Sequence, residues 1–123
     1  MTTVSSTRVK LMAYNEEISA RIYRLLRRRK GLTGKKMFGG FAYLLHGNLC
    51  CGVRDDYLIL RVGPDAYQQY LQSPHTREFA PTGRVMRGWI VVEHEGFERE
   101  DELNRLISQA VAFTLTLPPK DAA

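Results

Sequence analysis

Apolar residues near the start of the chain recur with the period of a helix. Four of them stand at i, i+4, i+7 and i+8, which is the spacing of one apolar helical stripe: Ile18, Ile22, Leu25 and Leu26. Asn15 supplies an N-cap, and the two glutamates after it lie where the helix dipole favours negative charge. The pattern predicts a helix over residues 15–29 that ends in a basic turn.

From about Lys36 the pattern becomes extended, with apolar and aromatic runs separated by turn dipeptides. We expect strands over residues 41–45, 49–53 and 57–62, joined by turns at Gly47-Asn48 and Asp55-Asp56. Loops this short leave no room for the helical crossovers that parallel strands need. The segment therefore predicts an antiparallel meander, with Gly39-Gly40 and Gly52 at kinks or bulges.

The second half of the chain predicts two more helices and one more extended stretch. Gly63-Pro64-Asp65 opens a short helix, because proline fits the first helical position. Residues 85–92 are extended and should join the sheet. A third helix begins in the acidic run that follows, carries a clear apolar stripe and ends before Pro118. Together these elements predict an α+β domain with helices flanking an antiparallel meander.

The length of 123 residues suits one hydrophobic core. We expect a domain over residues 14–117, between an N-terminal tail (1–13) and a C-terminal tail (118–123). No apolar run approaches the roughly 20 residues of a membrane-spanning helix, and the start lacks a secretory signal, so a soluble, cytoplasmic protein is expected. The adjacent Cys50 and Cys51 should point to opposite faces of their strand, which favours free thiols over a vicinal disulfide.

Charge is distributed unevenly along the chain. Residues 1–36 hold ten Lys or Arg and two acids, whereas residues 93–102 hold six acids and one Arg. Thirteen of the eighteen basic residues are Arg, which suits forked contacts with phosphate and carboxylate groups. This segregation indicates a partner: another protein, a second copy of the chain pairing its basic half with the acidic stretch, or a nucleic acid.

The predicted first helix carries arginines on one face. Arg21, Arg24 and Arg28 recur at i, i+3 and i+7, beside Tyr23. Such a stripe could neutralise phosphates while the ring stacks on a base. A solvated helix face explains it as well and is the favoured interpretation, because the excess charge is small beside that of dedicated nucleic-acid binders.

Motifs for chemistry are missing. The stretch from Gly31 to Lys36 differs from a phosphate loop in its glycine spacing, lacks the Ser or Thr after the lysine and follows a helix. The histidines are dispersed and no Cys-x-x-Cys is present, so we expect no metal and no cofactor. Asp55-Asp56 is interpreted as a turn. A non-enzymatic protein is expected. The alternative is a small-molecule site or an enzyme active site near Trp89 and Cys50 that no sequence motif indicates.

Three segments resemble a known family: the string Lys35-Lys36-Met37-Phe38-Gly39-Gly40, then Arg61-Val62-Gly63-Pro64, then Gly83-Arg84-Val85-Met86-Arg87-Gly88-Trp89. They resemble the N-terminal domain of TfoX/Sxy competence regulators, over about residues 14–117. The resemblance implies a secretion-chaperone-like α+β domain, with helices packed on one curved antiparallel sheet. Full-length members carry a second, helical domain and are associated with activation of DNA-uptake genes together with a cyclic-AMP receptor protein.

The chain stops after its third predicted helix, so we expect a stand-alone, single-domain member of this family. The expected function is a regulatory or protein-interaction domain, with a protein partner or a homodimer. Direct nucleic-acid binding through the first helix and the two lysines is the alternative. The candidate contacts with an anionic partner are Arg21, Arg24, Arg27, Arg28, Lys35 and Lys36.

Overall fold

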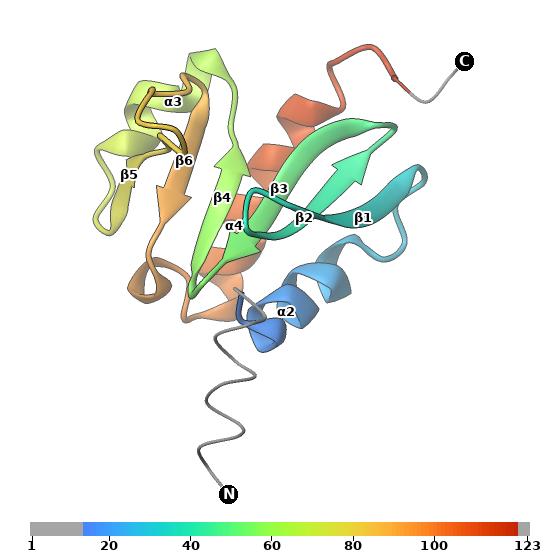
Figure 1. Ribbon diagram of the computed structural model, residues 1–123, viewed down its shortest axis with the longest axis horizontal. Coiled ribbons are helices and arrows are strands. Elements are labelled where there is room, and N and C mark those ends of the chain that lie inside the picture. Colours follow the sequence, from blue (N-terminus) through green and yellow to red (C-terminus); the bar gives the residue numbers. More distant parts are fainter. Residues whose placement is uncertain (1–13, 121–123) are drawn as a thin grey trace, which may run out of the picture.

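The computed structural model describes residues 14–120, so the predicted tail at residues 1–13 lies outside the described part of the chain. Figure 1 shows one twisted antiparallel sheet in the order β1-β2-β3-β4-β6-β5, with helices behind it. Its strands are β1 (Leu32–Met37), β2 (Gly40–Leu45), β3 (Asn48–Arg54), β4 (Tyr57–Arg61), β5 (Thr76–Glu78) and β6 (Trp89–Val92). The helices are α2 (Glu16–Leu26), α3 (Pro64–Leu71), the 3₁₀ turn η1 (His94–Gly96) and α4 (Glu100–Thr114). The predicted α+β class and antiparallel meander are confirmed.

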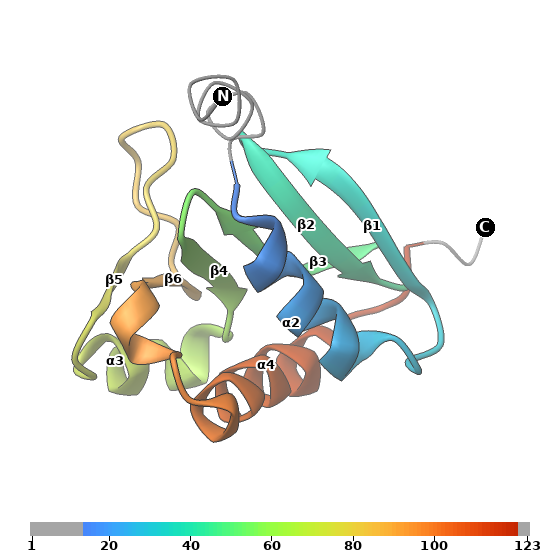
Figure 2. The same cartoon turned by 90° about the horizontal axis from the view of Figure 1, so that it is seen from below.

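Two helices cover one face of the sheet. α2 and α4 lie side by side beneath the strands (Figure 2), and the main core fills the space between them and the sheet. A smaller cluster lies on the other face, around Ile59, Phe79, Trp89 and Val91. Apart from a bulge in β3, the side chains of each strand alternate between these two faces, which determines the side on which each functional group stands.

α2 begins as predicted, because Asn15 caps it. The Asn15 side chain accepts hydrogen bonds from the backbone N–H groups of Glu17 and Ile18, at 2.8 and 3.2 Å. Its amide also donates to Asp56, at 3.0 Å, which ties the start of α2 to the predicted Asp55-Asp56 turn. The helix ends at Leu26, three residues earlier than the predicted 29, so the arginines after it stand in the connection to β1.

Both hairpins at the start of the meander differ from what the glycine pattern predicts. Phe38 and Gly39 form the first turn, with φ of 37° and 74°, so these residues close a hairpin instead of kinking a strand. His46 and Gly47 form the second, with φ of 51° and 82°, in place of Gly47-Asn48. Two successive positive φ values match the twist of tight hairpins. The first strand, β1, begins at Leu32, four residues before the predicted start of the extended region at about Lys36.

A bulge interrupts the pairing of β2 with β3. Tyr43 lies opposite Cys51 and Leu44 lies opposite Leu49, so Cys50 is the extra residue. Both thiols therefore belong to the core under the helices, and the expectation that they point to opposite faces is wrong. Gly52 does not form the bulge. A Cβ there would lie 2.6 Å from a backbone oxygen of β2, which explains why this position is glycine.

The second half departs from the prediction mainly in its strands. α3 starts at Pro64 as predicted, but the three-residue β5 was not foreseen. The extended stretch expected over residues 85–92 forms a strand only from Trp89, and Val85 and Met86 are exposed. The last helix starts at Glu100, after η1, and ends at Thr114.

Candidate functional site

Arg21 holds the fold together and is not free for a partner. Its Nε donates to Glu100 at 2.9 Å, and Nη2 donates to the carbonyl oxygens of Phe97 and Glu98 at 2.8 and 3.3 Å. Only 14% of its side chain is exposed. The guanidinium thus links α2 to the segment before α4, and this residue leaves the arginine stripe that the spacing predicted.

The other basic residues at the end of α2 are exposed. Within residues 14–120, none of them has a carboxylate at ion-pair distance. We call this group the basic surface: Arg24, Arg27, Arg28, Arg29 and Lys30. It retains three of the arginines predicted for partner contacts and adds two residues. The connection after Leu26 brings these two residues beside the helix.

Lys35 and Lys36 point to opposite faces of β1. Lys36 pairs with Phe41, whose ring packs against the main core, so the Lys36 side chain stands on the α2 side of the sheet. Lys35 pairs with Ala42 and stands on the other side. The two lysines were predicted as one contact, but only Lys36 shares a face with the basic surface.

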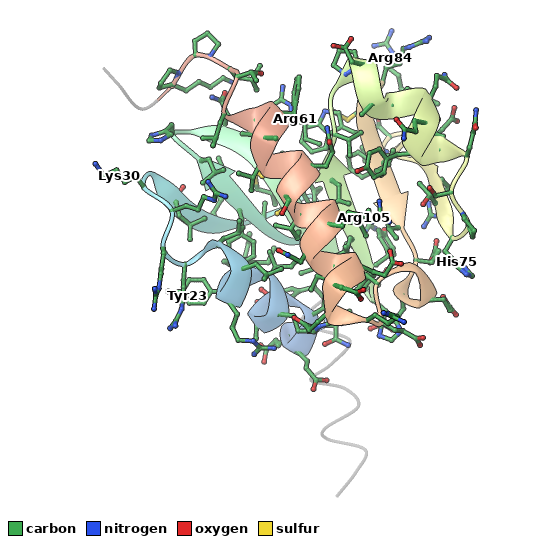
Figure 3. The ribbon with its side chains drawn as sticks, turned by 180° about the vertical axis from the view of Figure 1, so that it is seen from behind. Tyr23, Lys30, Arg61, His75, Arg84 and Arg105 are labelled. Atoms are coloured by element: carbon green, nitrogen blue, oxygen red, sulfur yellow. The ribbon has the colours of Figure 1, made fainter. Side chains whose placement is uncertain are left out.

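A groove of about 460 Å³ runs between the end of α2 and the edge strand β1. We call it the α2–β1 groove; its lining is Tyr23, Arg27, Arg29, Gly31, Leu32, Thr33, Gly34, Phe41 and Tyr43. Figure 3 shows Tyr23 and Lys30 on this side of the molecule, away from Arg84 and His75. The groove therefore combines an aromatic floor with two guanidinium groups that have no counter-charge in the described chain.

The aromatic floor is fixed by packing. The rings of Phe41 and Tyr43 meet edge to face with centroids 5.3 Å apart. The Tyr43 hydroxyl bonds the Ser19 hydroxyl at 2.7 Å and donates to the Ser19 carbonyl at 3.1 Å, which anchors it to α2. Burial raises the pKa of Tyr43 above its usual value, so the phenol stays neutral at physiological pH. Tyr23, which is 49% exposed, forms a wall above this floor.

Gly34 leaves room for that floor. A Cβ at this position would stand 2.8 Å from the Phe41 ring, so the ring lies across the edge strand where a side chain would otherwise be. The sequence analysis gave Gly34, Phe41 and Tyr43 no functional role. The signal that could have found them is the cross-strand pairing of a glycine with an aromatic residue, Gly34 with Tyr43.

A second basic hollow adjoins the first one. It has a volume of about 520 Å³ and shares Arg29 with the α2–β1 groove. Leu25, Arg28, Lys30, His46 and Leu115 complete its lining. Positive side chains therefore line both sides of the turn between α2 and β1.

The rest of the family string has structural roles. Phe38 packs with Phe79 at a centroid distance of 5.9 Å on the sheet face away from the helices. Gly40 lies so close to β3 that a Cβ would collide with the Val53 carbonyl. Met37 ends β1 beside the Phe38–Gly39 turn. These four residues shape the hairpin that presents the two lysines.

The acidic stretch lies around η1 and the start of α4 and is mostly paired. Five of its six carboxylates have an Arg or His nitrogen at 2.6 to 3.6 Å: Glu93, Glu98, Glu100, Asp101 and Glu102. The Arg99 guanidinium, hydrogen-bonded to Asp101, holds the pKa of that carboxyl below its usual value. A cleft of about 300 Å³ beside this stretch is lined by both signs of charge. This side therefore carries little uncompensated charge.

The two thiols are buried among apolar side chains. Both Cys50 and Cys51 are fully buried, while Trp89 belongs to the cluster on the opposite face of the sheet. The hydrogen bond between the thiols lowers the pKa of Cys50 and raises that of Cys51, which burial raises further. Arg61, which donates to the Leu49 carbonyl at the bulge, stacks on Trp89 with 5.2 Å to the ring centroid. Packed side chains thus separate the two residues named for the alternative small-molecule site.

Within residues 14–120, His, Cys, Asp and Glu side chains form no group of three that could hold a metal ion. None of the helices in that range has the length and apolar character needed to cross a bilayer.

No curated protein and no solved structure matches the chain. A model of the family described as the TfoX N-terminal domain does match, over residues 24–114, which run from α2 to the end of α4 and include the whole sheet. The chain belongs to the TfoX N-terminal domain family.

Proposed function

We propose that this protein is a non-enzymatic regulatory domain that acts in the cytoplasm by binding an acidic protein partner through its basic surface. One observation carries the proposal: the basic surface has no counter-charge among the described residues and borders a groove with an aromatic floor. Apolar contact beside unpaired positive charge is the composition of a protein-binding surface, where aromatic and arginine side chains contribute most of the binding energy.

A second copy of the chain fits this surface less well than another protein does. The acidic stretch that would face it already pairs with Arg21, Arg77, Arg99 and Arg105 of its own chain. Those pairs would have to open before the carboxylates could serve a neighbouring copy, which removes much of the electrostatic gain. We therefore place the acidic groups on a different molecule.

The test uses fluorescence anisotropy with a labelled oligoglutamate peptide at rising NaCl concentrations. We expect binding at low salt that weakens as salt rises and is lost in the double variant Arg27→Glu, Arg29→Glu. The matched control is Arg84→Glu, Arg87→Glu, which changes the net charge equally at exposed residues of the loop before β6 that do not line the groove. Figure 3 shows Arg84 on the other side of the molecule from Tyr23 and Lys30. Absence of binding by the parent protein, or equal loss in both variants, contradicts the proposal.

Direct nucleic-acid binding is the second candidate, and the exposed ring of Tyr23 among arginines favours it. A labelled oligothymidylate in the same titration decides between the two. If a nucleic acid is the partner, it binds with a steep salt dependence and Tyr23→Ala weakens it further, because stacking on the ring is lost. Light scattering on the same preparation detects self-association, which would make a second copy the partner.

A further inference from the structure

Among the residues that the structure describes, the outer edge of β1, which borders the α2–β1 groove, has backbone groups without a hydrogen-bond partner. The two-residue turn at Phe38–Gly39 makes Met37 and Gly40 a hydrogen-bonded pair. Hydrogen-bonded and non-hydrogen-bonded pairs alternate along an antiparallel ladder. The N–H and C=O groups of Lys36, Gly34 and Leu32 therefore point away from β2, toward solvent.

The side-chain positions of these three residues also lie on the groove side of β1. Gly34 and Leu32 line it, and Lys36 stands on the same side of the sheet. A residue that paired with Gly34 would place its own side chain on this side, over the Phe41 ring, where β1 contributes no side chain. Residues two positions before and after it would stand near Lys36 at one end and near Arg27 and Arg29 at the other.

We infer that β1 accepts an extended acidic peptide as an added strand, with an apolar residue opposite Gly34 and carboxylates two positions on either side. The inference deepens the proposed function and rests on it. Main-chain pairing at a sheet edge supplies affinity in this mode of recognition, and alternate side chains supply specificity. Here the alternate side chains meet an aromatic floor between positive groups.

Charge argues against the β1 strand of a second copy as the occupant. Two β1 strands paired with each other would bring two copies of Lys35 and Lys36 together, beside two copies of the basic surface. Like charges on paired strands destabilise the pairing. A nucleic-acid strand could use the charge and the rings, but it offers no row of N–H and C=O groups at strand spacing to match the edge.

The probe is the labelled peptide Thr-Glu-Thr-Phe-Thr-Glu-Thr, titrated by fluorescence anisotropy against the full chain. We expect Arg27→Glu with Arg29→Glu to weaken its binding more than about tenfold, since two attractions become repulsions. Gly34→Val places a side chain where the Phe41 ring lies, since a Cβ there would be 2.8 Å from the ring, and the displaced floor should have a similarly large effect on binding. Circular dichroism and thermal melting confirm that each variant is folded before it is titrated.

Lys36→Ala and Lys35→Ala form the matched pair of variants. Both remove one charge from neighbouring exposed positions of β1. Strand addition predicts that Lys36→Ala weakens binding by about threefold and that Lys35→Ala changes it less, because only Lys36 faces the groove. Equal effects of the two variants would contradict the inference, since nonspecific attraction does not distinguish the faces of the strand.

Backbone pairing is tested with methylated peptides. One version carries an N-methyl group on the Phe amide, and another carries it on the Thr amide that follows. An added strand directs alternate amides toward β1, so only one of the two versions should lose affinity, by about tenfold or more. Equal affinities of the two versions overturn the inference.

The peptide results separate the inference from the proposed function. If the oligoglutamate binds the basic surface but methylation has no effect, strand addition is wrong and the proposed function stands. If neither acidic peptide binds at low salt, both are wrong. Tighter binding of oligothymidylate than of either peptide, with loss in Tyr23→Ala, replaces both with nucleic-acid recognition.

Discussion

Two regions of the molecule carry opposite charges: the acidic segment at η1 and the start of α4, and the basic surface at the end of α2. Only the acidic segment finds counter-charges within the described chain. Arg21 donates to three oxygens around the start of α4, and three other arginines pair with Glu93, Asp101 and Glu102. Arg24, only three residues further along α2, has no carboxylate at ion-pair distance among residues 14–120. Charge at the first region stabilises the fold, whereas charge at the second is available for another molecule.

Among the variants that test this contrast, Arg21→Ala should have the largest effect on stability. Its guanidinium is mostly buried and satisfies a carboxylate and two carbonyl groups, so we expect a loss of about 2–3 kcal/mol in the free energy of unfolding. Urea denaturation measures it. The control Arg24→Ala should change the same free energy by less than about 0.5 kcal/mol, as exposed substitutions usually do. Similar losses for the two variants would break the contrast.

Tyr43→Phe tests whether the floor of the groove is held by the fold. The change removes the hydroxyl that bonds the Ser19 side chain and carbonyl, and leaves the buried Ser19 hydroxyl without that partner. We expect a loss of about 1–2 kcal/mol of unfolding free energy, again from urea denaturation. Tyr23→Phe, at an exposed ring, is the control and should be nearly neutral.

A smaller effect of opposite sign is expected from Arg24→Gln with Arg28→Gln. Removing two neighbouring positive charges relieves repulsion on the basic surface, which should stabilise the protein by about 0.5 kcal/mol at low salt. Thermal denaturation at low and high NaCl checks this, because screening removes the gain. Destabilisation at low salt would show that the basic surface contributes to folding after all.

The smallest effect concerns pH at the acidic segment. The pKa of Asp101 is lowered in the folded protein by Arg99, so its contribution to stability is present above the pKa of the unfolded chain and is lost as pH falls through the folded value. An NMR titration should find a midpoint below that of an ordinary aspartate. In Arg99→Gln the midpoint should rise toward the ordinary value, and an unchanged midpoint would remove the assigned cause.

The sequence predicted the parts of this fold that depend on residues close together in the chain, such as helix caps and turns. The cap at Asn15, the proline that starts α3 and the antiparallel meander follow from neighbouring residues. Longer-range pairing determines the rest. β5 forms a strand because it lies against β6, and the bulge at Cys50 depends on the register between two strands. Neither feature changes the hydrophobic pattern, so the sequence alone did not reveal them.

Only part of the candidate site could be predicted, again because long-range contacts determine the rest. The spacing of Arg21, Arg24 and Arg28 places them on one helix face, but the partners of Arg21 lie more than seventy residues away in the chain. Sequence spacing could not separate a structural arginine from an available one. Alternation along β1 could have separated Lys35 from Lys36, once the strand was known to begin at Leu32.

The bulge at Cys50 also gives the protein an internal reporter of its own motion. Both thiols lie in the core beneath the helices. The hydrogen bond with Cys51 lowers the pKa of Cys50, and the hydroxyl of Thr114, at the end of α4, lowers it further. Because both thiols are fully buried, we expect a thiol reagent to reach Cys50 when the last turn of α4 lifts from the sheet. The rate of labelling therefore measures the local opening of that helix end in the native state, without any introduced probe.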